Sequence, residues 1–378
     1  MLCIAFMAGC KKPYNPSVIN SPNSYLVVEG VINAAGITTI KLSRTVNLSG
    51  ATTLNPVTGA ALNIEDNQSN SYPLSEASPG SYMSNTQNLN SAFQYRLSIK
   101  TPDNQQYISN FENVQLTPPI DSIGFKIQNN GLQIYLNAHD ATNKTKYYRW
   151  DYDETWQFHA LYESSFISNG TDIVPRTAAQ MKYFCFSNDT SSTILLGSTA
   201  KLTQDVVFQN PITQIAPTSE KIETRYSINV RQYALSGDAF SFWTNLKKNT
   251  EQLGSIFDAQ PSNLAGNIHN VTNASEPVIG YISVSTVSSK RIFIDNGQLP
   301  YAWLPDYPYN CSLDSQWYCH PKTCNNDVAQ TLLPPGSGEF PVFPFYKGGS
   351  GPAGYMSSQL ACIDCTIRGT TKQPAFWK

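Results

Sequence analysis

Three acidic residues, Asp151, Asp153 and Glu154, form the densest group of side chains that could carry out chemistry. Carboxylate oxygens are suited to Ca²⁺, and a pair of carboxylates can hydrolyse a glycosidic bond. All three lie in an alternating run over residues 147–158, where a regular strand would turn Glu154 away from both aspartates. We therefore favour a solvated strand face with cross-strand pairing over a calcium site. A hydrolytic site stays open as an alternative.

No other catalytic motif is found in the sequence. The four histidines do not form a His-Glu-x-x-His pair, so the helix of a zinc protease is missing. Residues 348–351 read Gly-Gly-Ser-Gly, but Pro352 stands where a nucleophile elbow needs its last glycine. No glycine-rich loop ends in Gly-Lys-Ser or Gly-Lys-Thr, which a phosphate-binding loop would need. The sequence thus predicts no catalytic residue, no metal and no cofactor.

The N-terminus predicts where the protein is located. Residues 2–9 are apolar or small and are too few to span a bilayer, but they fit the core and cleavage site of a secretory signal. Residues 7–10, Met-Ala-Gly-Cys, have the form of a bacterial lipobox, in which the cysteine carries lipid. We expect residues 1–9 to be the remnant of a signal peptide whose start lies upstream. Cys10 is the expected lipid anchor, and residues 10–24 are the expected tether.

Export would place the other cysteines in an oxidising compartment, where an even number indicates disulfides. A zinc site that includes His320 is the alternative, but the cysteine spacings are irregular. The Cys-x-x-Cys pair at residues 362–365 lacks the strand-to-helix setting of a redox motif. Several pairings are possible, and the sequence does not choose among them. The disulfide candidates are Cys185, Cys311, Cys319, Cys324, Cys362 and Cys365.

Composition excludes one class of partner and suggests others. Charged residues make up 14% of the chain and the net charge is −2, so no surface for nucleic acid is expected. Trp303 and Trp317 lie in a Tyr- and Pro-rich region near the C-terminus. Exposed aromatic rings there could stack on a sugar or dock a partner, whereas packing around the disulfides is the alternative. Trp150, Trp156 and Trp243 are expected in the core.

Alternating apolar and polar residues predict a mainly β fold. Strand-like runs with turn signals between them indicate an Ig-like or transthyretin-like β-sandwich over residues 25–117. Residues 117–119, Thr-Pro-Pro, mark the boundary of this first domain. A larger β-rich domain over residues 118–378 is expected to follow, with one short helix at 237–251 and disulfide-stapled C-terminal loops over 298–360. The expected strands are 25–32, 37–42, 57–66, 93–99, 120–127, 132–136, 147–158, 226–233, 278–285 and 291–294.

Short motifs follow one another in a defined order over nearly the whole chain. They are Cys10, Leu26–Ile32, Leu42–Thr45, Val57–Ile64, Pro118–Ile123, Tyr148–Trp156, Phe242-Trp243, Phe257-Asp258, Pro261-Ser262, Gly266-Asn267, Gly280-Tyr281, Cys362–Cys365 and Pro374–Trp377. This order resembles the domain-of-unknown-function 4249 family of Bacteroidota lipoproteins. The resemblance implies an exported outer-membrane lipoprotein, often encoded beside a TonB-dependent transporter, and implies no established chemistry. Lys11 and Lys12 replace the acidic residues that often follow the lipid cysteine in surface-exported members, so both membrane faces stay open.

We therefore expect a non-enzymatic outer-membrane lipoprotein, lipid-anchored on the cell surface or on the periplasmic face. It would act as an accessory or ligand-binding partner of a TonB-dependent transporter, and a glycan or a peptide would be its ligand. Two alternatives stay open at this stage. One is a hydrolase with an unrecognised carboxylate site, and the other is a structural or adhesive surface protein.

Overall fold

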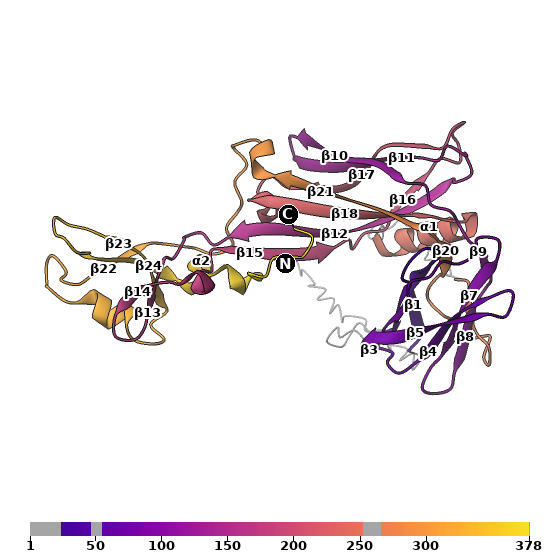
Figure 1. The fold of residues 1–378 in the computed structure, drawn as a ribbon, viewed down its shortest axis with the longest axis horizontal. Coiled ribbons are helices and arrows are strands. Elements are labelled where there is room, and N and C mark those ends of the chain that lie inside the picture. Colours follow the sequence, from indigo (N-terminus) through magenta and orange to yellow (C-terminus); the bar gives the residue numbers. More distant parts are fainter. Residues whose placement is uncertain (1–23, 47–54, 252–265, 378) are drawn as a thin grey trace, which may run out of the picture.

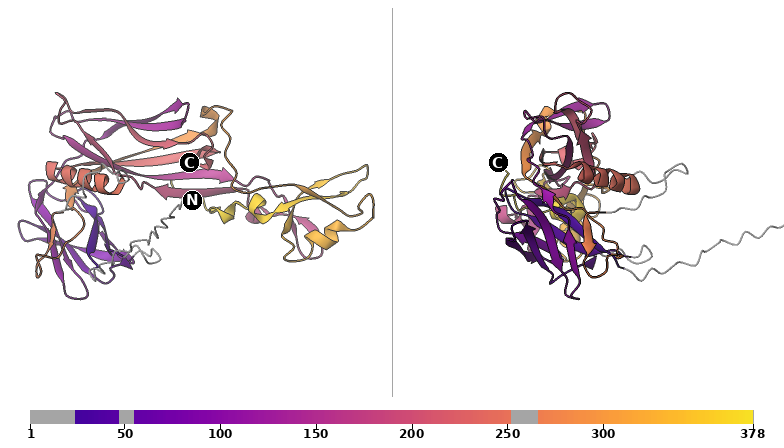
Figure 2. Two further views of the ribbon diagram at one scale, coloured as in Figure 1. Left: turned by 180° about the vertical axis from the view of Figure 1, so that it is seen from behind. Right: turned by 90° about the vertical axis from the view of Figure 1, so that its right-hand side faces the viewer.

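The computed structural model describes residues 24–46, 55–251 and 266–377. The fold is mainly β, as expected, and is drawn out along one direction (Figure 1). An N-terminal sandwich and a C-terminal arm lie at opposite ends of a central pair of sheets (Figure 2). The lipid-anchor candidate Cys10 and most of the expected tether lie outside the described residues. Among the residues that the structure describes, no helix is long and apolar enough to cross a lipid bilayer.

The N-terminal sandwich is built from one strongly bent sheet with the strand order β19-β8-β7-β4-β5-β6-β2-β1-β20. Its alternating strands bury one face each, so that Leu26, Tyr82, Tyr95 and Leu97 form a fully buried core. The short strands β3 and β9 pair with β2 and β7. The strands are β1 Leu26–Asn33, β2 Thr39–Arg44, β3 Asn55–Pro56, β4 Ala61–Asp66, β5 Ser71–Ser78, β6 Ser81–Ser84, β7 Gln94–Lys100, β8 Gln106–Ser109, β9 Glu112–Asn113, β19 Ile268–Asn270 and β20 Ser283–Ser285.

Two of these strands come from a part of the chain that the sequence analysis placed in the second domain. β19 pairs with β8, and β20 runs parallel to β1. Backbone crowding explains two glycines of this returning segment. A Cβ on Gly266 would lie 1.8 Å from the carbonyl oxygen of Gly280, and one on Gly280, which has φ +141°, would lie 2.2 Å from that of Val28.

The central region consists of two sheets that share one core. The first has the order β10-β11-β17, and the second has the order β15-β12-β18-β21 with β16 beside β12. Trp150, Tyr148 and Phe158 of β12 are buried in the same cluster as Leu132 and Ile134 of β11. The strands are β10 Ile120–Gln128, β11 Gly131–His139, β12 Tyr147–His159, β15 Phe184–Thr190, β16 Leu195–Ser198, β17 Val206–Ile215, β18 Arg225–Ala234 and β21 Val287–Asp295.

Helix α1, Gly237–Glu251, has the bounds that the sequence predicted. The hydroxyl of Ser236 accepts the amide of Ala239 at 3.2 Å and caps the first turn. Ala239 and Phe242 are buried together with Tyr281 of the returning segment. The helix therefore joins the central region to the N-terminal sandwich. The short 3₁₀ helices elsewhere are η1 Ala178–Gln180, η2 Glu220–Ile222, η3 Asn296–Gln298 and η5 Cys365–Ile367.

The C-terminal arm corrects the expectation of long loops over residues 298–360. Three segments there form a sheet with the order β22-β24-β23. These strands show no regular alternation of buried and exposed residues, and Pro341 and Pro344 lie inside β23, which is an edge strand where proline is tolerated. We use the name C-terminal arm for β13 Phe166–Ser168, β14 Ile173–Pro175, β22 Asp314–Trp317, the π-helix η4 Val328–Leu332, β23 Glu339–Phe345, β24 Gly354–Gln359 and α2 Leu360–Ile363.

All six cysteines that were expected in disulfides form them. Cys185 on β15 bonds to Cys365, and this bond fastens the end of the chain to the central sheet. Cys311, which precedes β22, bonds to Cys362 on α2 of the arm. Cys319 bonds to Cys324, five residues away, in an exposed turn. The bond between Cys185 and Cys365 spans a sequence separation of 180 residues, so it constrains the unfolded chain far more than the bond in the turn does.

Loop-closure entropy makes a prediction for these two bonds. Replacing Cys185 and Cys365 by alanine should lower the free energy of unfolding by about 5 kcal/mol, against about 2 kcal/mol for the matched Cys319→Ala, Cys324→Ala variant. Urea denaturation followed by tryptophan fluorescence measures both losses. Equal losses in the two variants would contradict the assignment of Cys185–Cys365 as the main covalent constraint.

Candidate functional site

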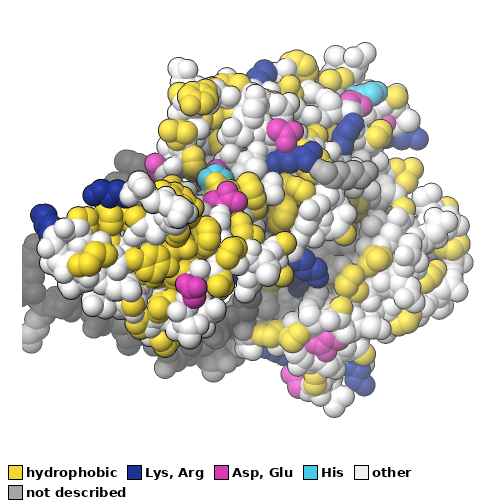
Figure 3. All heavy atoms as spheres, turned by 60° about the vertical axis from the view of Figure 1, so that its left-hand side comes forward, with side chains coloured by type: hydrophobic (Ala, Val, Ile, Leu, Met, Phe, Trp, Pro, Cys, Tyr) yellow, Lys and Arg dark blue, Asp and Glu magenta, His cyan; other side chains and the backbone are white. Residues whose placement is uncertain are grey.

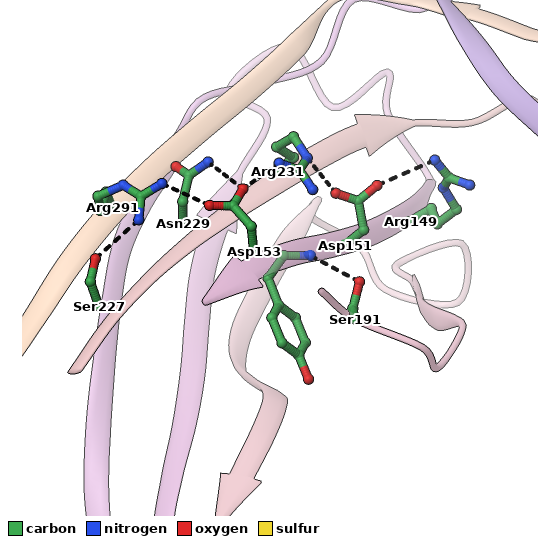
Figure 4. Close-up of polar contacts among 9 residues, drawn as sticks. Arg149, Asp151, Asp153, Ser191, Ser227, Asn229, Arg231 and Arg291 are labelled. Atoms are coloured by element: carbon green, nitrogen blue, oxygen red, sulfur yellow. Dashed lines mark hydrogen bonds and ion pairs between the residues drawn. The ribbon is translucent and has the colours of Figure 1, made fainter. Parts of the chain in front are cut away.

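The two aspartates predicted from the sequence lie in a network of charged side chains on one face of the central sheet (Figure 4). Strand register places Asp153 opposite Asn229 of β18, which in turn lies opposite Arg291 of β21. Asp151 lies opposite Arg231 of β18. The network is therefore made of cross-strand neighbours, which are the pairs that stabilise a sheet.

Every oxygen of the two aspartates has a cationic partner in this network. Arg231 bridges them, with Nε 2.5 Å from Asp151 Oδ1 and Nη1 2.5 Å from Asp153 Oδ1. Arg291 Nη2 lies 2.7 Å from Asp153 Oδ2. Arg149 Nη2 lies 3.6 Å from Asp151 Oδ2. The positive charge of three guanidinium groups around these oxygens disfavours binding of a cation there.

The pKa of Asp153 follows from these contacts. Burial by itself would raise the pKa of this carboxyl. The hydrogen bonds from Asn229 and Arg291, with the charges of Arg231 and Arg291, outweigh burial and hold the pKa of Asp153 below its usual value. Asp153 is therefore ionised at neutral pH, which suits an ion-pair partner and does not suit a general acid.

Glu154 lies on the opposite face of the sheet, as strand alternation indicated. Its side chain is 4% exposed and accepts a hydrogen bond from the hydroxyl of Tyr226 at 2.6 Å. Lys221, which follows β17 in the chain, forms an ion pair with Glu154 and lies 3.6 Å from Asp189 on β15. Burial and the charge of Glu154 raise the pKa of Tyr226 well above its usual value, so this hydroxyl stays a hydrogen-bond donor.

Two hollows flank β15, one on each face of the central sheet. The first hollow has a volume of about 290 Å³ and is lined by residues that include Phe186, Asn188, Thr190, Lys372, Pro374 and Phe376. The second hollow has a volume of about 270 Å³ and is lined by residues that include Tyr152, Glu154, Asp189, Thr213, Ser219 and Lys221. Asp153 borders the first hollow, and Glu154 borders both. The sheet therefore separates the predicted acidic group into two different environments.

A further ionisable cluster lies where β12 ends, and the sequence analysis missed it. Glu223 Oε1 lies 3.3 Å from His159 Nε2, and Glu223 Oε2 accepts the amide of His159 at 3.0 Å. Burial raises the pKa of Glu223 despite the nearby imidazole. Tyr307 and Arg368 both donate to the carbonyl of His159 at 3.1 Å. Glu223 lines neither hollow, and the contacts of this cluster join the residue after η2 and the C-terminal chain to the end of β12.

The two tryptophans singled out as contact candidates are partly buried. Trp303 packs against the central core. Trp317 lies in the arm, with its ring edge-on to Phe345 at 4.7 Å between centroids and with Lys347 Nζ 5.4 Å from its ring. Of the three tryptophans expected in the core, Trp150 and Trp156 are buried, and Trp243, which lies on α1, is partly buried beside Phe242 and Tyr281. Among the described residues, no group of three His, Cys, Asp or Glu side chains could hold a metal ion.

Comparison with known proteins gives one result at the family level. A family model described as a domain of unknown function, DUF4249, matches residues 11–291. The chain belongs to this family. The match covers the N-terminal sandwich and most of the central region, including the Asp–Arg network up to Arg291, and it confirms the resemblance at the level of the family. No curated protein matches this DUF4249 member.

Removing one carboxylate from the network tests its role. Asp153→Asn should lower the free energy of unfolding by about 2 kcal/mol at pH 7, because Arg231 and Arg291 lose a charged acceptor in a partly buried position. Asp189→Asn is the matched control, since its carboxylate is 59% exposed, and it should change stability by no more than about 0.5 kcal/mol. Urea denaturation measures both changes.

The difference in stability between the wild type and Asp153→Asn should depend on pH in one direction. The lowered pKa of Asp153 means that its contribution to the free energy of unfolding is complete above the pKa of aspartate in the unfolded chain, about 4. The contribution is lost as the pH falls through the lower pKa of the folded state. The stability gap between wild type and Asp153→Asn should therefore shrink below about pH 4. A gap that is independent of pH would show that Asp153 stabilises the fold in some other way.

Proposed function

We propose that this protein is a non-enzymatic, lipid-anchored accessory protein of the outer membrane that binds a TonB-dependent transporter, a nutrient ligand, or both. The observation that carries the proposal is the lipobox-like segment over residues 7–10, which would attach the protein to a membrane through Cys10. The low content of charged residues, 14%, is in keeping with a surface that meets uncharged partners. Either membrane face is compatible with Lys11 and Lys12.

The state of the carboxylates supports a binding role over hydrolysis. Hydrolysis by paired carboxylates requires one group that can give up a proton and one that can accept it. Asp151 and Asp153 are held by arginines, and the pKa of Asp153 is lowered. Glu154 is buried against Tyr226 and Lys221 on the other face. The acidic group therefore does not present the acid–base pair that a hydrolase needs.

The C-terminal arm supports docking of a partner. It extends from the end of the central sheets that lies away from the N-terminal sandwich (Figure 2). Hydrophobic side chains gather on the arm in a view with this end brought forward (Figure 3). Phe343 is 43% exposed and Tyr346 is 63% exposed, and they flank in sequence the partly buried Phe345, whose ring packs against Trp317. Exposed aromatic side chains grouped in this way are typical of protein interaction surfaces.

The lipid anchor has a direct test in the native host. Cys10→Ser should move the protein from the membrane fraction to the soluble fraction and should abolish its labelling by a palmitate analogue, because the acylated thiol is lost. Cys3→Ser is the matched control and should leave both readouts unchanged, since Cys3 lies in the expected signal peptide. Membrane retention and labelling of Cys10→Ser would contradict the proposal.

Partner binding through the arm is tested by affinity purification of the tagged full-length protein from native membranes. The wild-type protein should bring down a TonB-dependent transporter, and the double variant Phe343→Ser, Tyr346→Ser should recover at least about tenfold less of it. Phe208→Ser is the control, because Phe208 is an exposed aromatic residue on β17 outside the arm. Recovery of the wild-type lipoprotein alone would count against the transporter role.

A further inference from the structure

The outer edge of β15 carries main-chain groups that point away from the sheet. The amide of Ala160 donates to the carbonyl of Tyr183 at 2.8 Å, and the amide of Ser191 donates to that of Tyr152 at 2.9 Å. These two bonds establish which residues of β15 direct their main-chain amides and carbonyls toward β12. In an antiparallel ladder the direction alternates, so the amides and carbonyls of Phe186, Asn188 and Thr190 point outward.

The C-terminal chain covers only part of this edge. Phe186 and Thr370 exchange two main-chain hydrogen bonds, of 2.7 and 2.9 Å, so the edge already pairs with one extended segment. Beyond that pair the chain crosses the sheet. The centroid of the Phe376 ring lies 3.8 Å from the guanidinium carbon of Arg291. Asn188 is exposed, and within the described part of the chain no residue bonds to its main chain from the outer side. The amide of Thr190 is bound by the side chain of Asp189 at 2.8 Å.

The two hollows lie where the side chains of an added strand would go. A strand paired with Asn188 sends successive side chains to opposite faces of the sheet. The side chain opposite Asn188 would enter the first hollow, whose walls include Phe186, Pro374 and Phe376. The neighbouring residue on the Asp189 side would direct its side chain to the second hollow, beside Asp189 and Lys221.

The hollows differ in what they favour. The aromatic and proline walls of the first hollow favour an apolar side chain. The second hollow contains the carboxylates of Glu154 and Asp189, and both pair with the ammonium group of Lys221. Two negative charges and one positive charge leave an excess of negative charge. A lysine or arginine side chain complements that excess.

We propose that the open edge of β15 at Asn188 binds an extended peptide in which apolar and basic residues alternate. Main-chain hydrogen bonds to Asn188 supply the attachment, and the two hollows select the alternate side chains, which is the usual division of roles in strand addition. The proposal goes beyond the accessory role and does not depend on it, because it concerns the isolated protein. A failure to recover a transporter with the protein would therefore not affect the peptide-binding proposal.

The test uses the purified protein and a fluorescein-labelled peptide of three Lys-Val repeats, with binding followed by fluorescence anisotropy in low salt. The wild-type protein should bind this peptide at least about tenfold more tightly than a Glu-Val peptide of the same length. Asn188→Pro should weaken binding of the Lys-Val peptide at least about tenfold, because proline removes the outward amide. The matched variant Asn188→Ala keeps the amide and should bind within about twofold of wild type.

Charge reversal gives a second, independent readout. Asp189→Lys should weaken binding of the Lys-Val peptide and strengthen binding of the Glu-Val peptide, since it turns the excess charge of the second hollow positive. It also decides the question if Asn188→Pro does not fold, because Asp189 is an exposed side chain. The proposal is overturned if the wild-type protein binds neither peptide. It is equally overturned if a folded Asn188→Pro variant binds as wild type, or if Asp189→Lys leaves the preference unchanged.

Discussion

Burial of one face of β12 is the constraint on which the rest of the molecule depends. Tyr148, Trp150 and Phe158 lie fully within the core, and burying aromatic side chains of this size is the largest apolar contribution that a single strand can make. The strand pairs with β15, β16 and β18, and helix α1 packs beside it. Cys185 lies directly opposite Phe158 and carries the disulfide to Cys365. The disulfide thus fastens the C-terminal chain to the strand that pairs with β12.

The alternation of side chains along β12 also determines the surroundings of its three acidic residues. Because successive side chains change face, Asp151 and Asp153 must share the surface of the sheet while Glu154 is directed to the buried side. A carboxylate on the buried side needs charged and hydrogen-bonding partners, and Lys221 and Tyr226 provide them. On the surface, arginines of β18 and β21 form ion pairs with the two aspartates. Three acidic residues within a four-residue stretch therefore belong to two separate structural networks.

Local pattern and long-range pairing explain what the sequence could predict. The alternation over residues 147–158 and the cap at Ser236 are local signals, and they gave β12 and α1 with nearly the observed bounds. The partners of Asp153 depend on the register of β12 against β18 and β21, which no local pattern encodes. The return of residues 268–285 to the first sheet is also non-local. In the arm, Pro341 and Pro344 hid a real edge strand because proline usually argues against one.

The covalent framework explains why the edge of β15 is only half covered. The disulfide at Cys185 holds the C-terminal chain against this edge. Phe186 and Thr370 form a single antiparallel pair there, which covers the edge at one residue. Beyond this point the chain turns across the sheet, where Phe376 packs over Arg291 and Trp377 packs edge-on to Phe186 and Phe293. Packing of these aromatic rings on the Asp–Arg face thus competes with further pairing along the edge. Exposed strand edges are normally protected against association, so a short open stretch at Asn188, with a hollow on each side, has the form of a binding position.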